Sequence, residues 1–335
     1  MRPGIEDVAR AAGVSTATVS RALRGLPNVT EATRLRVRAA ADRLGYVPSP
    51  SAASLVTGRT RTIAVVCPWV NHWFFANVIE GAEAMLRTEG FDVLLHTFDS
   101  SRSQPRPPLD PSSLRRRVDG VLVLGVPLDE QEIQAVLDLG QPVIFVGTGS
   151  DDTVTVRLDD VRAGREATEH LLELGHRRIG HLLGTPDGIA RWNPGVQRYE
   201  GWLAAMRSAG VEPEPGWAVP GRFDLATGRS ALHALLDAHP EVTAVFAASD
   251  EMAMGALIAA RERGIEIGKE LSLIGIDGHD VGEVIGLTTM AQPAVEQGQV
   301  AATMLLDMMT GAPVPDDVVF TTTLVRRSST APPAA

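Results

Sequence analysis

Short, continuously apolar segments alternate with segments of helical periodicity after Arg61, and this alternation limits the fold more than any other feature. The first apolar segments are TIAVVCP (62–68), FDVLLHTF (91–98), DGVLVLGV (119–126) and PVIFVG (142–147). Helical periodicity covers residues 76–89 and 130–139 between them. Strands that are apolar at nearly every position suit a parallel sheet covered by helices on both faces. We therefore predict a doubly wound α/β fold for this part of the chain.

A second series of the same kind begins near residue 163 and predicts a second lobe. Its expected helices are 163–174, 198–209, 227–238 and 251–263, and its expected strands are 178–184, 217–221, 244–249 and 271–277. We place the two lobes in residues 62–330, with lobe 1 at about 62–158 and 293–319 and lobe 2 at about 159–290 and 320–330. Residues 331–335 are expected to form a disordered tail.

Residues 1–48 follow a purely helical pattern that predicts a small all-α headpiece. Three short helices are delimited by residues that favour turns and caps, namely Gly13, Ser15, Thr30 and Gly45. Their expected common core consists of Val8, Val14, Val19, Leu23, Val37 and Leu44. Pro48 and Pro50 then break the chain, so we assign residues 49–61 to a hinge and linker.

Charge is distributed very unevenly along the chain. The whole sequence carries a formal net charge of −10, yet residues 1–61 contain ten arginines against four acidic residues and carry +6, which leaves −16 on the remainder. A basic headpiece on an acidic body attracts the phosphate backbone of nucleic acid at one end only. The segment IEDVARAAGVSTATVSRAL (5–23) also has the spacing of a helix-turn-helix, with a helical hairpin and a solvated face as the alternative.

Cysteine and histidine usage exclude several kinds of site. Cys67 is the only cysteine, which rules out an internal disulfide and a cysteine-cluster metal site and fits a reducing compartment. The eight histidines show no metal-ligand spacing, so no metal and no cofactor is expected. The segment MRPGIEDVARAAG has neither a signal-peptide pattern nor a long apolar run, so we expect a cytoplasmic protein without membrane contact.

Short motifs along the whole chain match one known family. They are IEDVA (5–9), AGVSTATVSR (12–21), LGY (44–46), VDGV (118–121), LGHRRI (174–179), AVFAASDEMAMGAL (244–257) and LIGID (273–277). In these motifs the chain resembles the LacI/GalR family of transcriptional repressors. The resemblance implies a helix-turn-helix headpiece and a periplasmic-binding-protein-like sensor domain with two lobes. It also implies a homodimer that binds double-stranded operator DNA and a small-molecule effector.

On this resemblance, the second helix of the headpiece reads base edges in the major groove. The expected base contacts are Thr16, Ala17 and Arg21, since arginine donates two hydrogen bonds to guanine and small side chains allow close approach. The expected backbone contacts are Ser15, Thr18, Ser20, Asn28 and Thr30. In the hinge, Leu55 matches the family's minor-groove wedge, and an incidental leucine in a disordered linker is the alternative. The family usually has arginine where this chain has Ala53.

Aromatic residues make up only 4% of the chain, and three are consecutive at the carboxyl edge of the first predicted strand. Trp73, Phe74 and Phe75 cannot all face the core. We expect Phe74 and Phe75 to form a stacking wall for a sugar ring or a planar base, with packing against the opposite lobe as the alternative.

The resemblance implies further effector-binding residues, namely Arg191, Trp192, Arg198, Phe223, Asp250 and Asp277. Asp250 has an alternative role as the N-cap of the helix that begins at Glu251. At Gly147, family members often have Asp or Asn, so a polar contact to the effector is expected to be missing here.

We therefore expect a transcription regulator, acting as a repressor, whose operator affinity is controlled by an effector bound between the lobes. A carbohydrate is favoured because an arginine and a carboxylate each engage vicinal hydroxyls. The alternatives are a co-repressor-type regulator that senses a nucleobase and a solute-binding protein of a transport system. An enzyme is not expected, because no phosphate-binding glycine loop and no nucleophile with a base is apparent in the sequence.

Overall fold

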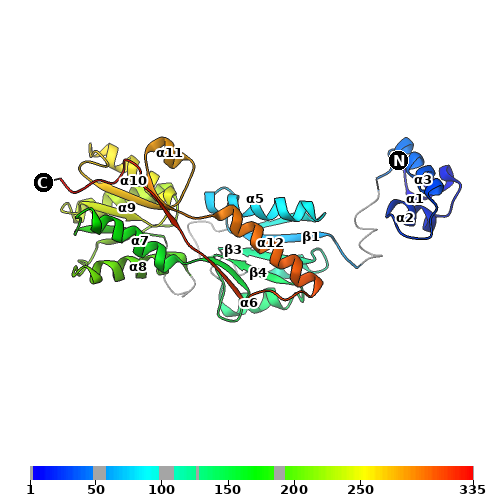
Figure 1. The fold of residues 1–335 in the computed structure, drawn as a ribbon, viewed down its shortest axis with the longest axis horizontal. Helices are drawn as coiled ribbons and strands as arrows, with labels where there is room; N and C mark the ends of the chain where they lie inside the picture. The colour runs from blue at the N-terminus through cyan, green and yellow to red at the C-terminus, as the bar shows by residue number, and fades with distance from the viewer. Residues whose placement is uncertain (1–2, 48–57, 98–108, 126–127, 185–192, 335) are drawn as a thin grey trace. The chain divides into compact units, whose positions relative to one another are not determined.

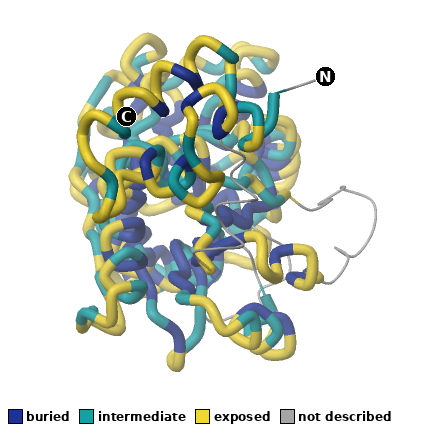
Figure 2. The backbone as a smooth tube through the Cα atoms, turned by 90° about the vertical axis from the view of Figure 1, so that its right-hand side faces the viewer, coloured by how far each residue is buried: buried dark blue, intermediate teal, exposed yellow. Residues whose placement is uncertain are grey.

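The chain folds into two compact units, Met1–Thr60 and Arg61–Ala335 (Figure 1). The computed structural model describes residues 3–47, 58–97, 109–125, 128–184 and 193–334. The first unit is a three-helix headpiece, and the second contains two six-stranded sheets, which with their helices form lobe 1 and lobe 2. Figure 2 shows buried segments inside the larger unit and exposed turns around them. Within the described ranges, no helix is long and apolar enough to cross a membrane.

The headpiece consists of α1 (Ile5–Ala12), α2 (Thr16–Leu23) and α3 (Glu31–Leu44). Its predicted caps are confirmed. The Ser15 hydroxyl accepts a hydrogen bond from Thr18 N (3.2 Å), and the Thr30 hydroxyl accepts one from the first turn of α3 (3.3 Å). Gly13 and Gly45 end α1 and α3 with φ of 64°, a left-handed conformation that glycine adopts without a steric penalty.

The headpiece core contains more alanine than we predicted. Val8, Val19 and Val37 are fully buried, as expected. The three other predicted core residues, Val14, Leu23 and Leu44, are half-buried at its edge. The centre is completed by Ala9, Ala12, Ala22, Ala40 and Ala41. The sequence pattern identified the inward faces but not the small side chains that allow three short helices to pack closely.

Lobe 1 is a parallel sheet in the order β11-β5-β4-β3-β1-β2. Its strands are β1 (Thr62–Cys67), β2 (Asp92–Thr97), β3 (Gly120–Leu124), β4 (Val143–Val146), β5 (Thr155–Leu158) and β11 (Asp317–Phe320). One face is covered by α5 (Trp73–Thr88) and α12 (Ala294–Thr310), the other by α6 (Glu130–Leu137) and the 3-10 helix η1 (Pro111–Leu114). Within β1, Ile63 and Val65 serve the first face and Ala64 and Val66 the second, which explains the continuously apolar segment.

Lobe 2 repeats this plan in the order β12-β10-β9-β8-β6-β7, with only β12 antiparallel to its neighbour. Its strands are β6 (Ile179–Leu183), β7 (Ala218–Pro220), β8 (Ala244–Ala247), β9 (Ser272–Asp277), β10 (Thr288–Ala291) and β12 (Thr323–Val325). Its helices are α7 (Asp160–Glu173), α8 (Pro194–Ser208), α9 (Leu225–Ala238), α10 (Asp250–Glu262) and α11 (Val281–Ile285). The expected doubly wound architecture is confirmed in both lobes.

The chain passes between the lobes three times, at residues 158–160, 291–294 and 320–323. The first and third crossings are hydrogen-bonded to each other, since Asp159 N donates to Phe320 O (2.8 Å). The second crossing leads from β10 directly into α12. Three short connections of this kind allow one lobe to rotate against the other.

The prediction of a disordered tail at residues 331–335 is wrong for Ala331, its first residue. Ala331 N donates to the Ser272 hydroxyl (3.0 Å), and Ala331 O accepts from that hydroxyl and lies 2.9 Å from His176 Nε2. These contacts attach the tail to β9 and to the segment before β6. Composition alone suggested disorder because it does not show which backbone groups find partners.

Candidate functional site

The predicted recognition helix α2 presents its small residues outward. Thr16, Ala17 and Arg21 are exposed, whereas Val19 and Ala22 on the opposite face are fully buried in the headpiece core. An exposed face of small side chains with one arginine is compatible with close approach to the major groove.

Two of the predicted backbone-contacting residues lie at the N-terminal ends of α2 and α3. Ser15 and Thr30 are exposed N-caps, and Thr18 and Ser20 are half-buried on α2. Asn28 is exposed in the preceding loop with φ of 67°. Helix N-termini carry unpaired amides and partial positive charge, so they suit contact with phosphates.

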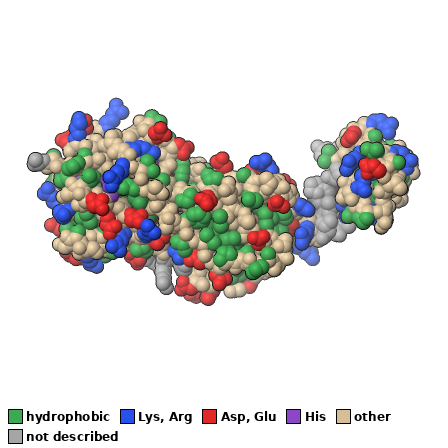
Figure 3. Space-filling model, in the orientation of Figure 1, with side chains coloured by type: hydrophobic (Ala, Val, Ile, Leu, Met, Phe, Trp, Pro, Cys, Tyr) green, Lys and Arg blue, Asp and Glu red, His purple; other side chains and the backbone are tan. Residues whose placement is uncertain are grey.

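Arginines supply the positive charge of the headpiece. Several of these side chains are visible on it in Figure 3. Two arginines are already paired within their helices, Arg10 with Asp7 and Arg34 with Glu31. Leu55 and Ala53, the predicted minor-groove positions, lie outside the described residues.

In lobe 1, the aromatic cluster divides into three roles. Phe75 is buried in the core, edge-to-face with Trp69 (5.9 Å between ring centroids), and its place in a ligand wall stays a prediction. Phe74 is half-buried and faces Gly147, where an added Cβ would lie 3.3 Å from Phe74 Cζ. Gly147 also has φ of 66°, so this departure from the family pattern makes room for the Phe74 ring.

Trp73, the third aromatic residue, contacts the opposite lobe. Its indole Nε1 donates to Asp280 Oδ1 (3.2 Å), and its ring stacks on His279 (5.9 Å). Its backbone N donates to Glu251 Oε1 (3.0 Å), while His72 Nδ1 lies 2.5 Å from Glu251 Oε2. The hydrogen bond to Glu251 raises the pKa of His72. The start of α5 is therefore joined to α10 and to the loop before α11. For Trp73, this contact agrees with the alternative that the aromatic residues pack against the opposite lobe.

Arg198, predicted in the effector cleft, is buried and held by protein partners. Its Nε donates to Asp160 Oδ1 (2.7 Å), its guanidinium donates to Ala248 O, and the group lies over the Phe223 ring (5.7 Å). Burial raises the pKa of Asp160, and Arg198 opposes that effect. Sequence reasoning missed Asp160, whose only signal is an acidic residue in the first turn of a helix.

Asp277 ends β9 with a buried side chain and φ of 141°. Burial raises its pKa to about 7, although the charge of Arg198 acts in the opposite direction. Asp250 N donates to Asp277 Oδ2 (3.4 Å), so the two predicted aspartates are neighbours.

Asp250 is not the N-cap of α10. Ser249 caps this helix by accepting from Met252 N (3.2 Å), and Asp250 is the first helical residue. Its Oδ2 accepts from Gly278 N (2.9 Å) and His279 N (2.8 Å), so it fixes the loop after Asp277. The alternative capping role we considered is therefore wrong.

Phe223, which also belongs to lobe 2, lies beside Arg198. It has φ of 56°, and its ring occupies the space beside Gly184, where an added Cβ would lie 2.0 Å from Phe223 Cζ. Arg191 and Trp192 lie outside the described residues. The structure thus brings Arg198, Asp250 and Asp277 together as buried polar side chains, with the half-buried Phe223 ring against Arg198.

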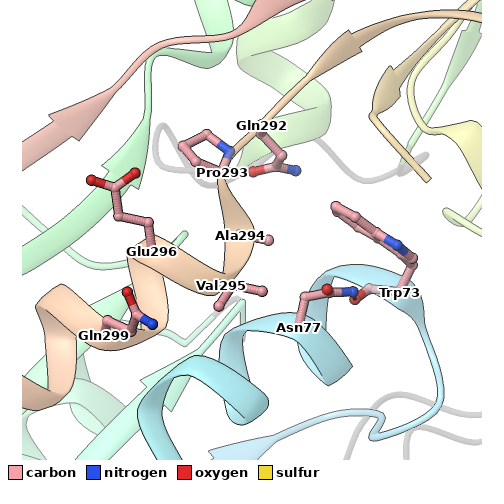
Figure 4. Close-up of a pocket in the computed structure, with 8 residues that line it drawn as sticks. All are labelled: Trp73, Asn77, Gln292, Pro293, Ala294, Val295, Glu296 and Gln299. Carbon is pink, nitrogen blue, oxygen red and sulfur yellow. Dashed lines mark hydrogen bonds between the residues drawn. The ribbon is translucent and has the colours of Figure 1, made fainter. Parts of the chain in front are cut away.

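A separate open pocket of about 430 Å³ lies between the N-terminal parts of α5 and α12 (Figure 4). It is lined by Trp73, Asn77, Gln292, Pro293, Ala294, Val295, Glu296 and Gln299. Gln292 links this pocket to the predicted set, because its Nε2 donates to Asp277 Oδ1 (2.7 Å).

Among the described residues, one group of potential metal ligands occurs in lobe 2. Glu214, His239 and Glu241 each place one ligand atom within 4.8 Å of the others. Glu241 Oε1 already accepts from Trp217 Nε1 (3.2 Å) and lies 3.1 Å from His239 Nδ1. Hydrogen bonding accounts for this grouping, so we assign it no metal.

A helix-turn-helix headpiece joined to two parallel-sheet lobes with a buried polar group near their junction defines a class, the ligand-regulated transcription regulators. Comparison with known proteins identifies the family. A model of "Bacterial regulatory proteins, lacI family" matches residues 4–49, and one of a "Periplasmic binding protein-like domain" matches residues 168–330. The HTH-type transcriptional regulator CelR of Thermobifida fusca is 35% identical over 98% of both chains. This chain belongs to the LacI family.

Further relatives support the same assignment. The HTH-type transcriptional repressor CytR of Escherichia coli is 36% identical over 92% of this chain and 90% of its own. A Lac repressor dimer bound to operator and the anti-inducer ONPF has a TM-score of 0.86 at 26% identity, covering 99% of this chain and all of that one. A CelR–cellobiose complex has a TM-score of 0.72 at 33% identity, with 98% and 100% coverage. The chain is thus a ligand-regulated, DNA-binding transcription regulator and not an enzyme, as predicted.

Proposed function

We propose that this regulator is a repressor whose effector, a carbohydrate, binds against a set of aromatic and polar side chains, namely Phe74, Phe75, Arg198, Phe223, Asp250 and Asp277. The observation that carries the proposal is the buried group around Arg198, in which one guanidinium is fixed by Asp160 (2.7 Å) and lies over the Phe223 ring (5.7 Å). An oriented arginine and a nearby carboxylate discriminate vicinal hydroxyls, while an aromatic ring covers the apolar face of a sugar. Arg191 and Trp192 complete the proposed set.

Two relatives support the choice of a sugar. The structure of CelR contains cellobiose, and that of a LacI family regulator from Enterococcus faecium, 30% identical over 81% of this chain, contains ribose. A nucleobase is the competing effector, since its flat face would also stack on Phe74.

For DNA, we propose that Thr16, Ala17 and Arg21 contact bases and that Ser15, Thr18, Ser20, Asn28 and Thr30 contact the backbone, with Leu55 as the minor-groove wedge. The exposure of the first three on α2 supports this assignment. Because a regulator of this kind works where operator DNA is, we propose a cytoplasmic location.

The regulator is further proposed to act as a homodimer through lobe 2. The helices α10 and α11 each leave apolar side chains exposed to water. Val284 is 86% exposed, Val281 44% and Ile258 40%. An apolar surface of this kind is typical of a subunit interface, and two copies would present two headpieces to the half-sites of a pseudo-palindromic operator.

Control of DNA binding is proposed to act through the relative orientation of the two lobes. The contacts of His72 and Trp73 with Glu251 and Asp280 hold one orientation. An effector that binds this orientation and the rotated one unequally shifts the balance between them by its difference in affinity. The hinge segments of the dimer transmit that shift to the headpieces.

The effector proposal is tested by thermal shift of the full-length protein with cellobiose, ribose and adenine. A bound compound raises the melting temperature in proportion to ln(1 + [L]/Kd). We expect a sugar to give the largest shift and Asp277→Ala to abolish it, while Asp307→Ala on the exposed surface of α12 leaves it intact. Retention of the full shift by Asp277→Ala would remove Asp277 from the site, and a shift with adenine alone would replace the sugar by a nucleobase.

A further inference from the structure

A buried line of hydrogen-bonded side chains runs from Asp277 through the second crossing into lobe 1. Gln292 Nε2 donates to Asp277 Oδ1 (2.7 Å), and Gln297 Nε2 donates to Gln292 Oε1 (3.0 Å). Asp277 ends β9 in lobe 2, Gln292 lies in the crossing, and Gln297 belongs to α12 in lobe 1. All three side chains are buried, with Gln297 at 0% exposure. The line therefore connects a proposed effector contact with the first turns of α12.

Gln297 has an amide side chain at a position of α12 where helix periodicity predicts an apolar one. Ala294 and Ala301, three residues before it and four after it, belong to the core that α12 shares with α5. Gln297 Oε1 is buried and has no hydrogen-bond partner among the described residues. Burying an acceptor without a partner costs free energy. A methionine would fill similar space without that cost, so the amide points to a role for its NH2 group.

The polarity of the line is set by Asp277. An ionised carboxylate only accepts hydrogen bonds, so Gln292 must turn its NH2 group toward Asp277 and its carbonyl away from it. Gln297 donates to that carbonyl. A flipped Gln292 amide would bring two oxygens together at one end and two NH2 groups together at the other. In the orientation that serves an ionised Asp277, Gln297 adds a hydrogen bond to Gln292 and helps to hold it against the carboxylate.

We propose that Gln297 is a positioning residue for effector recognition, which holds Gln292 so that Asp277 meets the hydroxyls of a polyol as a hydrogen-bond acceptor. The inference rests on the proposed role of Asp277 in the effector site. Gln297 itself touches no effector in this scheme and acts through Gln292.

The electrostatic surroundings make Asp277 sensitive to the orientation of one donor. Burial raises its pKa to about 7; Arg198 of α8 acts to lower it, and Asp250 and Glu251 of α10 act to raise it. His279, in the loop after β9, donates its amide to Asp250 (2.8 Å). A carboxylate that titrates near neutral pH changes its charge measurably when a hydrogen bond to its ionised form is weakened.

The test compares the melting of full-length protein and the Gln297→Met variant between pH 6 and pH 8.5 without effector. At high pH the ionised Asp277 needs the donor that Gln297 orients, whereas at low pH a protonated Asp277 donates to a flipped Gln292. The folded-state pKa of Asp277 therefore rises further in the variant, and its stability deficit widens as pH rises. Loss of one hydrogen bond corresponds to a widening of about 2–4 °C for a domain of this size.

Two controls separate this role from simple packing. Gln299→Met makes the same change at an exposed position of α12 and is expected to show no pH-dependent deficit. In an Asp277→Asn background, the pH dependence of the Gln297→Met deficit is expected to disappear. A deficit of equal size at every pH, or one that survives Asp277→Asn, would overturn the proposal.

Effector affinity gives a second readout that distinguishes the two proposals. For whichever of cellobiose, ribose and adenine stabilises the wild-type protein, we expect Gln297→Met to weaken binding about fivefold to tenfold by titration calorimetry. If Asp277→Asn abolishes that binding and Gln297→Met leaves it unchanged, the positioning role fails and the effector site stands. If Asp277→Asn leaves binding unchanged, the effector site itself is wrong.

Discussion

The buried His181 is expected to lower the free energy of unfolding when the pH is lowered. It lies fully buried in β6, its ring stacks on Phe246 (4.4 Å between centroids), and its Nδ1 lies 2.9 Å from Phe246 O. Burial lowers its pKa from 6.5 to about 4. A histidine with a depressed folded-state pKa binds more protons when unfolded, so its contribution to stability is complete above about pH 6.5 and declines as pH falls toward 4.

The size of this effect follows from the pKa difference. At ~1.4 kcal/mol for each pKa unit, acidification from pH 7.5 to pH 5 lowers the free energy of unfolding by about 2 kcal/mol through His181 alone, with a ceiling of about 3 kcal/mol below pH 4. His181→Phe keeps a stacking ring that does not titrate. The variant loses the bond to Phe246 O and is less stable at pH 7.5, but its free energy of unfolding falls less on acidification.

Urea unfolding at pH 7.5 and pH 5, followed by tryptophan fluorescence, measures the difference. All five tryptophans follow Arg61, so the signal reports the larger unit and not the headpiece. The matched control is His96→Phe, which replaces a half-buried histidine of β2 and is expected to keep the acid sensitivity of the wild type. Equal losses of stability for wild type and His181→Phe between the two pH values would refute the reasoning.

Three further changes test a helix cap, a helix–helix contact and the attachment of the C-terminal tail. Ser15→Ala removes the acceptor for Thr18 N and is expected to lower headpiece stability by about 1 kcal/mol, seen as earlier loss of the helical circular dichroism signal; an unchanged headpiece transition would argue against the cap. Gly81→Ala places a Cβ 2.0 Å from Val295 O between α5 and α12, so a loss of about 1–3 kcal/mol is expected by urea unfolding, and wild-type stability would show that the helices are not in close contact. Deletion of residues 331–335 removes the Ala331 contacts and should lower the melting temperature of the larger unit by a few degrees, whereas no change would mean that they contribute nothing.

The fold could be predicted from the sequence because its main signals are local. A strand buried on both faces is apolar at nearly every position, as β1 and β3 are, and this pattern does not depend on the rest of the chain. Caps such as Ser15 and Thr30 also follow from a few neighbouring residues.

The site was predicted less completely because its partners come from distant segments. Nothing local indicates that Asp160 would pair with Arg198, 38 residues further along the chain. Similarly, periodicity cannot decide which of two consecutive phenylalanines enters the core, and the structure buries Phe75 and leaves Phe74 half-buried. Ser249 and Asp250 are both good capping residues, and only the loop at Gly278 shows why Asp250 serves another purpose.

The most direct test of ligand-regulated DNA binding is a gel-shift titration of the full-length protein on fragments from upstream of its own operon, with and without the compound that gives the largest thermal shift. We predict sequence-specific retardation that changes with that compound and is lost in Arg21→Ala, whose altered side chain lies on the exposed face of α2 and outside the headpiece core. The account would be contradicted if unrelated competitor DNA abolished binding as effectively as competitor DNA of the operator sequence, whether or not the compound is present.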